Sequence, residues 1–120
     1  ADVVEDARSR HPREDDFIVL GDLNADCDYF DEEDLGHPLR SMQYTWLIGN
    51  DQDTNLAASD CTYDRIIVTA GLREDYAKEA GVFRFDAVFG IEGKAAKKVS
   101  DHYPVYARFA VGRDSGVGGR

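Results

Sequence analysis

The stretch FIVLGDLNAD, residues 17–26, decides how the rest of the chain is interpreted. Four apolar residues lead into Gly21 and predict a buried strand. Asp22 and Asn24 follow at once, which places them at the carboxyl end of that strand, where α/β folds commonly hold their ligands. A second interpretation stays open here, because Asp and Asn also favour turns and helix caps for local reasons.

The length and charge of the chain limit the classes of protein it can represent. It has 120 residues, enough for one domain, and its 14 basic and 24 acidic residues give a net charge of −10. This charge argues against binding nucleic acid by phosphate neutralisation, but not against an enzyme that meets a phosphodiester through bound divalent cations. No apolar run approaches the roughly 18 residues of a membrane span.

The N-terminus carries neither a signal peptide nor an initiating Met. We therefore expect the chain to start within a longer protein or after processing.

The pattern of apolar residues predicts several strands and little helix. Residues 2–10 predict a short helix, residues 30–42 a loop with one helical turn, and residues 93–100 a further helical turn. The expected strands are 17–20, 44–48, 61–70, 102–111 and a strand-like segment over 81–90. A sheet with so few helices lacks a second layer, so the sequence indicates one half of a larger fold.

Acidic residues stand at the ends of three of these strands. Asp22 follows the first, Asp64 opens the strand of YDRIIV, and Asp101 and His102 directly precede the last. If the strands share a sheet, these side chains converge on one acidic cleft. The alternative for the Asp101–His102 pair is a solvated surface position.

A converging set of this kind suits metal-assisted attack on a phosphodiester. Carboxylates such as Asp22 and Asp101 suit Mg²⁺, which prefers oxygen ligands. The neutral amide of Asn24 can hold a phosphate oxygen or the attacking water without repelling the anion. His102 is the proton carrier suited to neutral pH, and Asp64 can fix its tautomer.

Cys27 and Cys61 each lie beside one of these acidic segments. Either they form a disulfide that closes a loop of about 34 residues and ties two site loops together, or they are two unpaired small core residues.

Three motifs in this order, GDLNAD (21–26), CTYDRIIV (61–68) and SDHYPV (100–105), resemble the endonuclease/exonuclease/phosphatase superfamily. Among its branches the chain looks most like the deoxyribonuclease I group. That branch has a cysteine after the first motif and another before YDRI, and a segment similar to WLIGNDQDT (46–54). The resemblance runs from Phe17 to Phe109.

The resemblance implies the fold as well. Residues 1–111 match the C-terminal half of a four-layer α/β/β/α sandwich, an α/β (α+β) fold with a mainly antiparallel or mixed sheet, and residues 112–120 form a Gly-rich tail expected to be disordered. The family's N-terminal Asn, its metal-binding Glu and its second catalytic His have no counterpart here. His11 and His37 match neither position and are expected at the surface.

Roles for individual residues follow from the same resemblance. Asp22 and Asn24 are expected at the metal and the scissile phosphate. Asp101 is expected to help Asp22 bind Mg²⁺, with Mn²⁺ as the alternative ion, or to help bind the phosphate group. Asp64 is expected to pair with His102, which acts as a general acid or base.

Two further features are implied by the resemblance. One is a disulfide between Cys27 and Cys61, which suggests an oxidising, extracellular setting. The other is a calcium site on loop 51–59, for which Asp53, Asn55 and Ser59 offer oxygens. Ala57 departs from the family there because it lacks a hydroxyl, which puts the calcium site in doubt.

The sequence thus predicts part of the active site of a Mg²⁺-dependent endonuclease that cleaves DNA, with the isolated chain inactive. Two alternatives remain: a superfamily phosphodiesterase acting on another phosphate ester, or a non-catalytic interaction fragment. The expected partners are DNA and either the missing N-terminal half or a second copy, and no membrane. Arg40, Arg65 and Arg73 are the local cations expected to meet DNA, although Arg65 fits a structural ion pair equally well.

Overall fold

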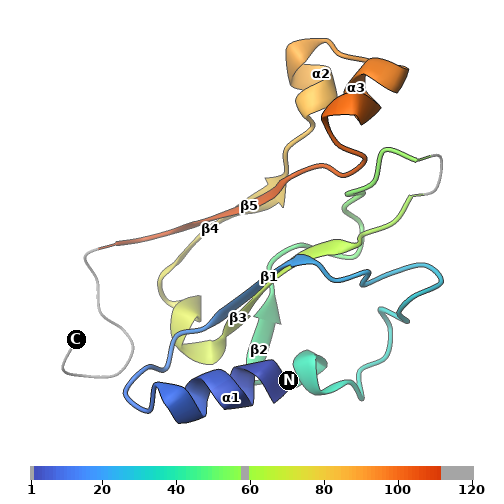
Figure 1. Ribbon diagram of the computed structural model, residues 1–120. Coiled ribbons are helices and arrows are strands. Elements are labelled where there is room, and N and C mark those ends of the chain that lie inside the picture. The colour runs from blue at the N-terminus through green and yellow to red at the C-terminus, as the bar shows by residue number, and fades with distance from the viewer. Residues whose placement is uncertain (1, 58–59, 112–120) are drawn as a thin grey trace.

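The computed structural model describes residues 2–57 and 60–111 of the chain (Figure 1). It is a mixed α/β structure with antiparallel sheets and a few helices, as the sequence predicts. The expected disordered tail at 112–120 lies outside the described residues. The elements are α1 (Asp2–Arg10), β1 (Ile18–Asp22), the 3₁₀ turn η1 (Pro38–Arg40), β2 (Tyr44–Trp46), β3 (Asp64–Thr69), the 3₁₀ turn η2 (Ala70–Arg73), β4 (Tyr76–Val82), α2 (Phe85–Phe89), α3 (Gly93–Val99) and β5 (Val105–Phe109).

The strands form two antiparallel sheets. The first has the order β1-β3-β2, and the second consists of β4 and β5. In the first sheet Ile18 pairs with Val68, and four residues further along Asp22 pairs with Asp64. The register therefore sets the last residue of β1 directly beside the first residue of β3.

Strand β3 is the centre of the core, because all six of its residues are buried. Ile66 and Val68 point to one face and pack against Val105 of the second sheet. Ile67 points to the other face, where it packs with Val4 of α1. The layers are thus α1, the first sheet and the second sheet, while α2 and α3 lie together at the end of the molecule farthest from α1 (Figure 1).

The prediction of a strand-like segment over residues 81–90 is wrong for most of that range. Strand β4 ends at Val82, and α2 occupies Phe85–Phe89. Phe85 is buried against Ala96 of α3 and Tyr103, so tertiary packing overrides the β propensity of the phenylalanines. Gly90 ends the helix with φ +67°, the left-handed conformation that glycine adopts without strain. The chain consequently has more helix than its sequence predicts.

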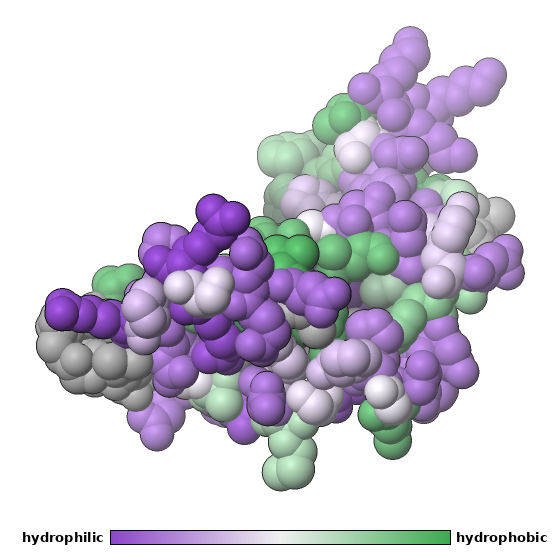
Figure 2. Space-filling view, turned by 60° about the horizontal axis from the view of Figure 1, so that its bottom comes forward, coloured by the Kyte–Doolittle hydropathy of each residue, from purple (hydrophilic) through white to green (hydrophobic). Residues whose placement is uncertain are grey.

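Strand β1 is less buried than its apolar sequence predicts. Ile18 is 43% exposed and Leu20 is 64% exposed. Both share the face of Ile66 and Val68, but β1 is an edge strand and the second sheet packs chiefly over β3. In the view of Figure 2, apolar side chains reach the surface near the middle and are surrounded by hydrophilic ones.

The described helices are all too short or too polar to traverse a bilayer.

Candidate active site

Three separate segments bring Asp22, Asp64 and His102 together. Asp22 and Asp64 are opposite each other across β1 and β3, so their side chains share one face of the sheet. His102 lies just before β5, where its backbone forms an antiparallel bridge with Asn55. The expected convergence is therefore present for these residues, although β5 belongs to the second sheet and not, as we expected from the sequence, to the sheet of β1 and β3.

The imidazole of His102 lies between carboxylates. Its Nδ1 is 2.7 Å from Oδ2 of Asp64, and because a carboxylate only accepts, Nδ1 carries the proton and donates it. On the opposite side of the ring, Nε2 is 3.8 Å from Oδ2 of Asp22 and 4.0 Å from Oδ1 of Asp101. Asp64 is buried and His102 half-buried, whereas Asp22 and Asp101 are exposed. The pair is thus anchored inside, with Nε2 turned toward water and two carboxylates.

Opposing effects act on the pKa of His102. Partial burial lowers this pKa, while the hydrogen bond to Asp64 and the negative charges of Asp64, Asp22 and Asp101 raise it, and the net pKa lies above the ordinary value. An imidazole with a raised pKa is the stronger base, so His102 is suited to accepting a proton at Nε2 near neutral pH.

The same group could hold a metal ion. One ligand atom from each of Asp22, Asp64 and His102 lies within 4.8 Å of the other two. Asp101 lies outside this tight group, although it borders Nε2 of His102. Since Asp64 is engaged with His102, the carboxylates facing water are those of Asp22 and Asp101, and such oxygens fit a hard divalent cation.

Asn24 lies on the turn that follows β1. Its φ of +48° is in the left-handed region, which Asn tolerates better than most residues. Its backbone N–H donates to Oδ1 of Asp22 at 3.1 Å. The N–H groups of Leu23 and Ala25 both donate to the carbonyl of Tyr63. The turn is therefore fastened to the start of β3, which keeps Asn24 beside Asp22.

Arg65 does not meet DNA, contrary to one of the two roles expected for it, because its side chain is 0% exposed. Its guanidinium donates to the carbonyls of Thr62, Ile48 and Ala25, to Oδ1 of Asn50, and to Oε2 of Glu32 at 3.0 Å. The structural role that the sequence allowed is present, with Glu32 as the acidic partner. Burial lowers the pKa of Arg65, and the hydrogen bond to Glu32 opposes this effect.

The other two arginines also contact the protein itself. The guanidinium of Arg40 lies 3.8 Å from the ring centre of Trp46. Arg73 is exposed and donates to the hydroxyl of Thr45 and the carbonyl of Met42.

A disulfide joins Cys27 to Cys61, with 6.0 Å between their Cα atoms. The bridge ties the loop after Asn24 to the residues before β3. The remaining histidines are positioned differently from each other. His11 is exposed, as expected, but His37 is half-buried and its Nδ1 accepts the N–H of Leu39 at the start of η1.

The loop expected to bind calcium is held by hydrogen bonds of its own. Oδ1 of Asp53 accepts the N–H groups of Asn55 and Cys61, and Oδ1 of Asn55 accepts that of Ala57. Ser59 lies outside the described residues. The calcium site therefore stays a prediction.

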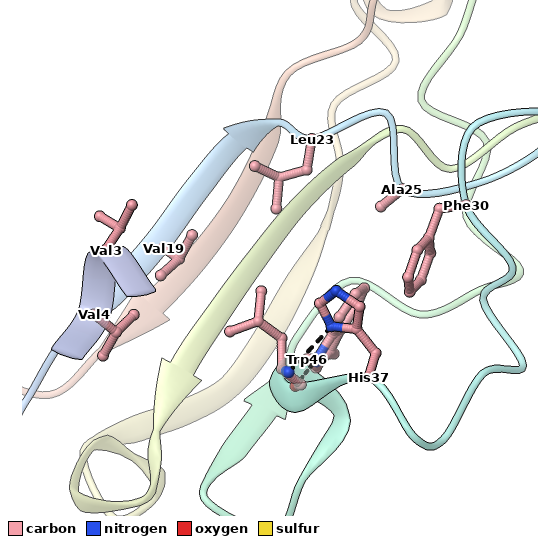
Figure 3. A pocket seen from close by; sticks show the side chains of 9 residues that line it. Val3, Val4, Val19, Leu23, Ala25, Phe30, His37 and Trp46 are labelled. Atoms are coloured by element: carbon pink, nitrogen blue, oxygen red, sulfur yellow. Dashed lines mark hydrogen bonds between the residues drawn. The ribbon is translucent and has the colours of Figure 1, made fainter. Parts of the chain in front are cut away.

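An apolar pocket of about 340 Å³ lies on the opposite face of the first sheet. Val3 and Val4 of α1, Val19 of β1 and Trp46 of β2 line it (Figure 3). Leu23 also borders this pocket, but His102, Asp22 and Asp64 are not among its lining residues. The pocket is therefore separate from the acidic group.

Sequence reasoning missed Thr54, which is buried beneath the Asp64–His102 pair and bonds to the backbone of Asp64. A threonine in a polar segment such as NDQDTNL gives no signal of burial.

The chain is homologous to deoxyribonuclease I and deoxyribonuclease I-like proteins over about a third of their length. It is 41% identical to mouse deoxyribonuclease-1-like 2 over 99 residues, which make up 79% of this chain and 36% of that protein. It is 37% identical to bovine deoxyribonuclease-1-like 1 over 113 residues, or 92% of this chain and 35% of that protein. It is 37% identical to sheep deoxyribonuclease-1 over 94 residues, which make up 75% of this chain and 36% of that protein.

No family model matches the chain. The resemblance inferred from the motifs is confirmed by these relatives, and the chain spans about a third of the length of each of them.

Proposed function

We propose that this chain carries part of the active site of a Mg²⁺-dependent endonuclease that hydrolyses phosphodiester bonds in DNA. The observation that carries the proposal is the His102–Asp64 contact of 2.7 Å, with Nε2 of the same ring turned toward Asp22. A base oriented by one carboxylate and facing others is an arrangement that hydrolases use. Homology to proteins named deoxyribonucleases supports DNA as the substrate.

Each residue of the group has a distinct task in this proposal. Asp64 holds the proton on Nδ1 of His102 and stabilises the imidazolium that forms. His102 then moves a proton at Nε2, taking it from the attacking water or giving it to the leaving oxygen. Asn24 donates an N–H of its side-chain amide to a phosphate oxygen.

Asp22 and Asp101 would hold the Mg²⁺ ion, with Mn²⁺ as the alternative. The ion neutralises the negative charge of the phosphate so that the site can accept an anion. This matters in a chain whose net charge is −10. A calcium ion held by Asp53, Asn55 and Ser59 is a second, separate proposal.

We further propose that residues 1–111 form the C-terminal half of a sandwich domain. The exposure of Ile18 and Leu20 on the edge strand β1 supports an uncovered sheet face, and the match to about a third of each relative supports the chain being one part of a longer domain. The partner is the rest of the domain or a second copy of the chain. Because a disulfide ties the site loops, an oxidising, extracellular setting is the one we infer for the protein.

One observation favours a different substrate within the same reaction class. An apolar hollow of about 410 Å³ adjoins Asp64 and His102 and is lined by Phe83, Phe89 and Val99. A phosphodiester with an apolar ester group would fill such a hollow better than a polar one. The alternative function is therefore hydrolysis of a phosphodiester other than DNA.

A plasmid-nicking assay tests the proposal on the complete protein that contains this chain. Nicking is expected with Mg²⁺ and is abolished by a chelator. His102→Ala should lower the rate about 100-fold or more, whereas His11→Ala, which removes an exposed histidine, should not. Nicking that survives His102→Ala contradicts the proposal, and hydrolysis of an apolar phosphodiester without nicking supports the alternative.

A further inference from the structure

Thr54 lies in the connection between β2 and β3 and is 0% exposed. Buried hydroxyls are almost always hydrogen-bonded, because an unpaired one is unfavourable away from water. The hydroxyl of Thr54 is buried close to the proposed active site. Its hydrogen-bond partners therefore show which segments this hydroxyl holds in place.

The hydroxyl of Thr54 bonds to the backbone of the segment that runs from Cys61, which forms the disulfide, to Asp64. Its Oγ1 accepts the N–H of Tyr63 at 3.0 Å and that of Asp64 at 3.2 Å. It also lies 3.4 Å from the carbonyl of Cys61, to which it donates. A hydroxyl has one donor and two acceptor positions, so all of its bonding capacity is used on this one segment.

The backbone of the same residue holds the segment of His102. The carbonyl of Thr54 accepts the N–H of Tyr103 at 2.9 Å. Its neighbour Asn55 forms the bridge to His102, and the N–H of Leu56 donates to the carbonyl of Asp101. One residue thus spans the gap between the two chain segments that carry the acid and the imidazole.

Tyr63 extends the connection to the third segment. Its N–H is bound by Thr54, while its carbonyl accepts the N–H groups of Leu23 and Ala25 on the turn after Asp22. The turn after Asp22, which the pairing of β1 with β3 already sets beside Asp64, is therefore also linked to the same hydroxyl through Tyr63.

We propose that Thr54 is a positioning residue, whose hydroxyl and carbonyl together set the distance between Asp64 and His102. The catalytic consequence rests on the proposed function, but the positioning itself is a property of the chain and can be measured without activity. The competing explanation is that Thr54 only stabilises its loop.

Three substitutions separate these explanations. Thr54→Val keeps the shape and removes the hydroxyl, and Thr54→Ser keeps the hydroxyl and removes the methyl group. Thr69→Val is the matched control, because Thr69 is also buried and its hydroxyl also bonds only to the backbone, accepting the N–H of Phe17 and donating to the carbonyl of Asp15. Thr69 ends β3, whereas Asp64 begins it.

The first measurement is the NMR signal of the His102 Nδ1 proton in the complete protein that contains this chain, with folding monitored by circular dichroism. The hydrogen bond to Asp64 is expected to give a downfield, slowly exchanging signal. Thr54→Val should shift or broaden this signal, while Thr54→Ser and Thr69→Val should retain it. A retained signal in Thr54→Val overturns the proposal, and so does its equal loss in Thr54→Ser or Thr69→Val.

The second measurement is steady-state hydrolysis by the complete protein. Misplacing an oriented base lowers kcat more than it changes KM, and we expect Thr54→Val to reduce kcat about 10-fold or more. Thr54→Ser should restore kcat to within about threefold of the unaltered protein. An unchanged kcat in Thr54→Val overturns the catalytic part of the inference.

The two measurements also separate this inference from the proposed function. Suppose that Thr54→Val alters the His102 signal, but the complete protein hydrolyses no phosphodiester. This outcome supports the positioning role and contradicts the proposed function. Should Thr54→Val not fold, Thr54→Ala replaces it in both measurements, with the same expected results and the same contradicting ones.

Discussion

Asp22 and Asp64 are direct partners across β1 and β3, so two carboxylates stand side by side at one end of the sheet. Like charges opposite each other in a sheet destabilise it. Here the ring of His102 contacts both, at 2.7 Å from Asp64 and 3.8 Å from Asp22. A protonated imidazole or a bound cation offsets the repulsion, which is why we regard this pairing as functional rather than structural.

Asp64→Asn tests whether the pair orients a catalytic base. The amide can no longer stabilise the imidazolium of His102, so kcat of the complete protein should fall about 100-fold or more while KM changes little. Asp51→Asn, an exposed acid on the neighbouring loop, is the control and should leave kcat unaltered. An unchanged turnover number in Asp64→Asn would show that the pair is not catalytic.

The raised pKa of His102 predicts how stability depends on pH. The protonated ring is stabilised in the folded chain by its carboxylates, so its contribution is complete below the ordinary pKa of about 6.5 and is lost as pH rises through the raised pKa. Urea unfolding should therefore show the largest loss of stability in His102→Gln at mildly acidic pH and a smaller loss in alkali. The same comparison in an Asp64→Asn background should show a weaker pH dependence, and an equal dependence there would contradict the assignment.

Removal of the Cys27–Cys61 disulfide should destabilise the chain. The cysteines are 34 residues apart, and a bridge of this span is worth about 3–4 kcal/mol in the chain-entropy model. Urea unfolding of Cys27→Ala/Cys61→Ala should give a lower free energy of unfolding by about this amount. The same measurement on the unaltered chain with a reductant is the control. Two titratable thiols in the oxidised, folded chain would rule the bridge out.

Association of the isolated chain follows from the exposed apolar residues of β1. Ile18 and Leu20 stand on an edge strand, which offers both apolar contact and unpaired backbone groups. Light scattering should report dimers or larger species, and Ile18→Lys/Leu20→Lys should shift them toward monomer. Leu35→Lys replaces an exposed leucine on a loop and should not. A strictly monomeric chain that nicks DNA, and ceases to do so as His102→Ala, would disprove the half-fold proposal.

The sequence predicts the first sheet and the acidic group well because local patterns determine them. The apolar runs of β1 and β3 end at Asp22 and begin at Asp64, so strand ends alone place the two acids. The motif SDHYPV sets His102 just before β5, and its contact with Asp64 is confirmed.

Other features depend on contacts between distant segments and have no local pattern. The segment that begins at Phe85 is helical because Phe85 packs on Tyr103, although the residues next to it in the sequence favour a strand. The burial of Thr54 depends on Asp64, 10 residues away, and on the much more distant segment of Tyr103. Periodicity likewise gives no indication that β1 is an edge strand, and hence that Leu20 is exposed.

The bonding of Arg65 has a consequence for the order in which the chain folds. Its guanidinium joins Ala25, 40 residues away, to Glu32, 33 residues away, and to Ile48, 17 residues away. The full set of contacts exists only when three loops have closed, and loop closure is the slow part of building a fold dominated by non-local pairing. We therefore expect the acidic group to be assembled late, after β3 has paired with its neighbours, so that an incompletely folded chain carries the acids without the geometry of the site.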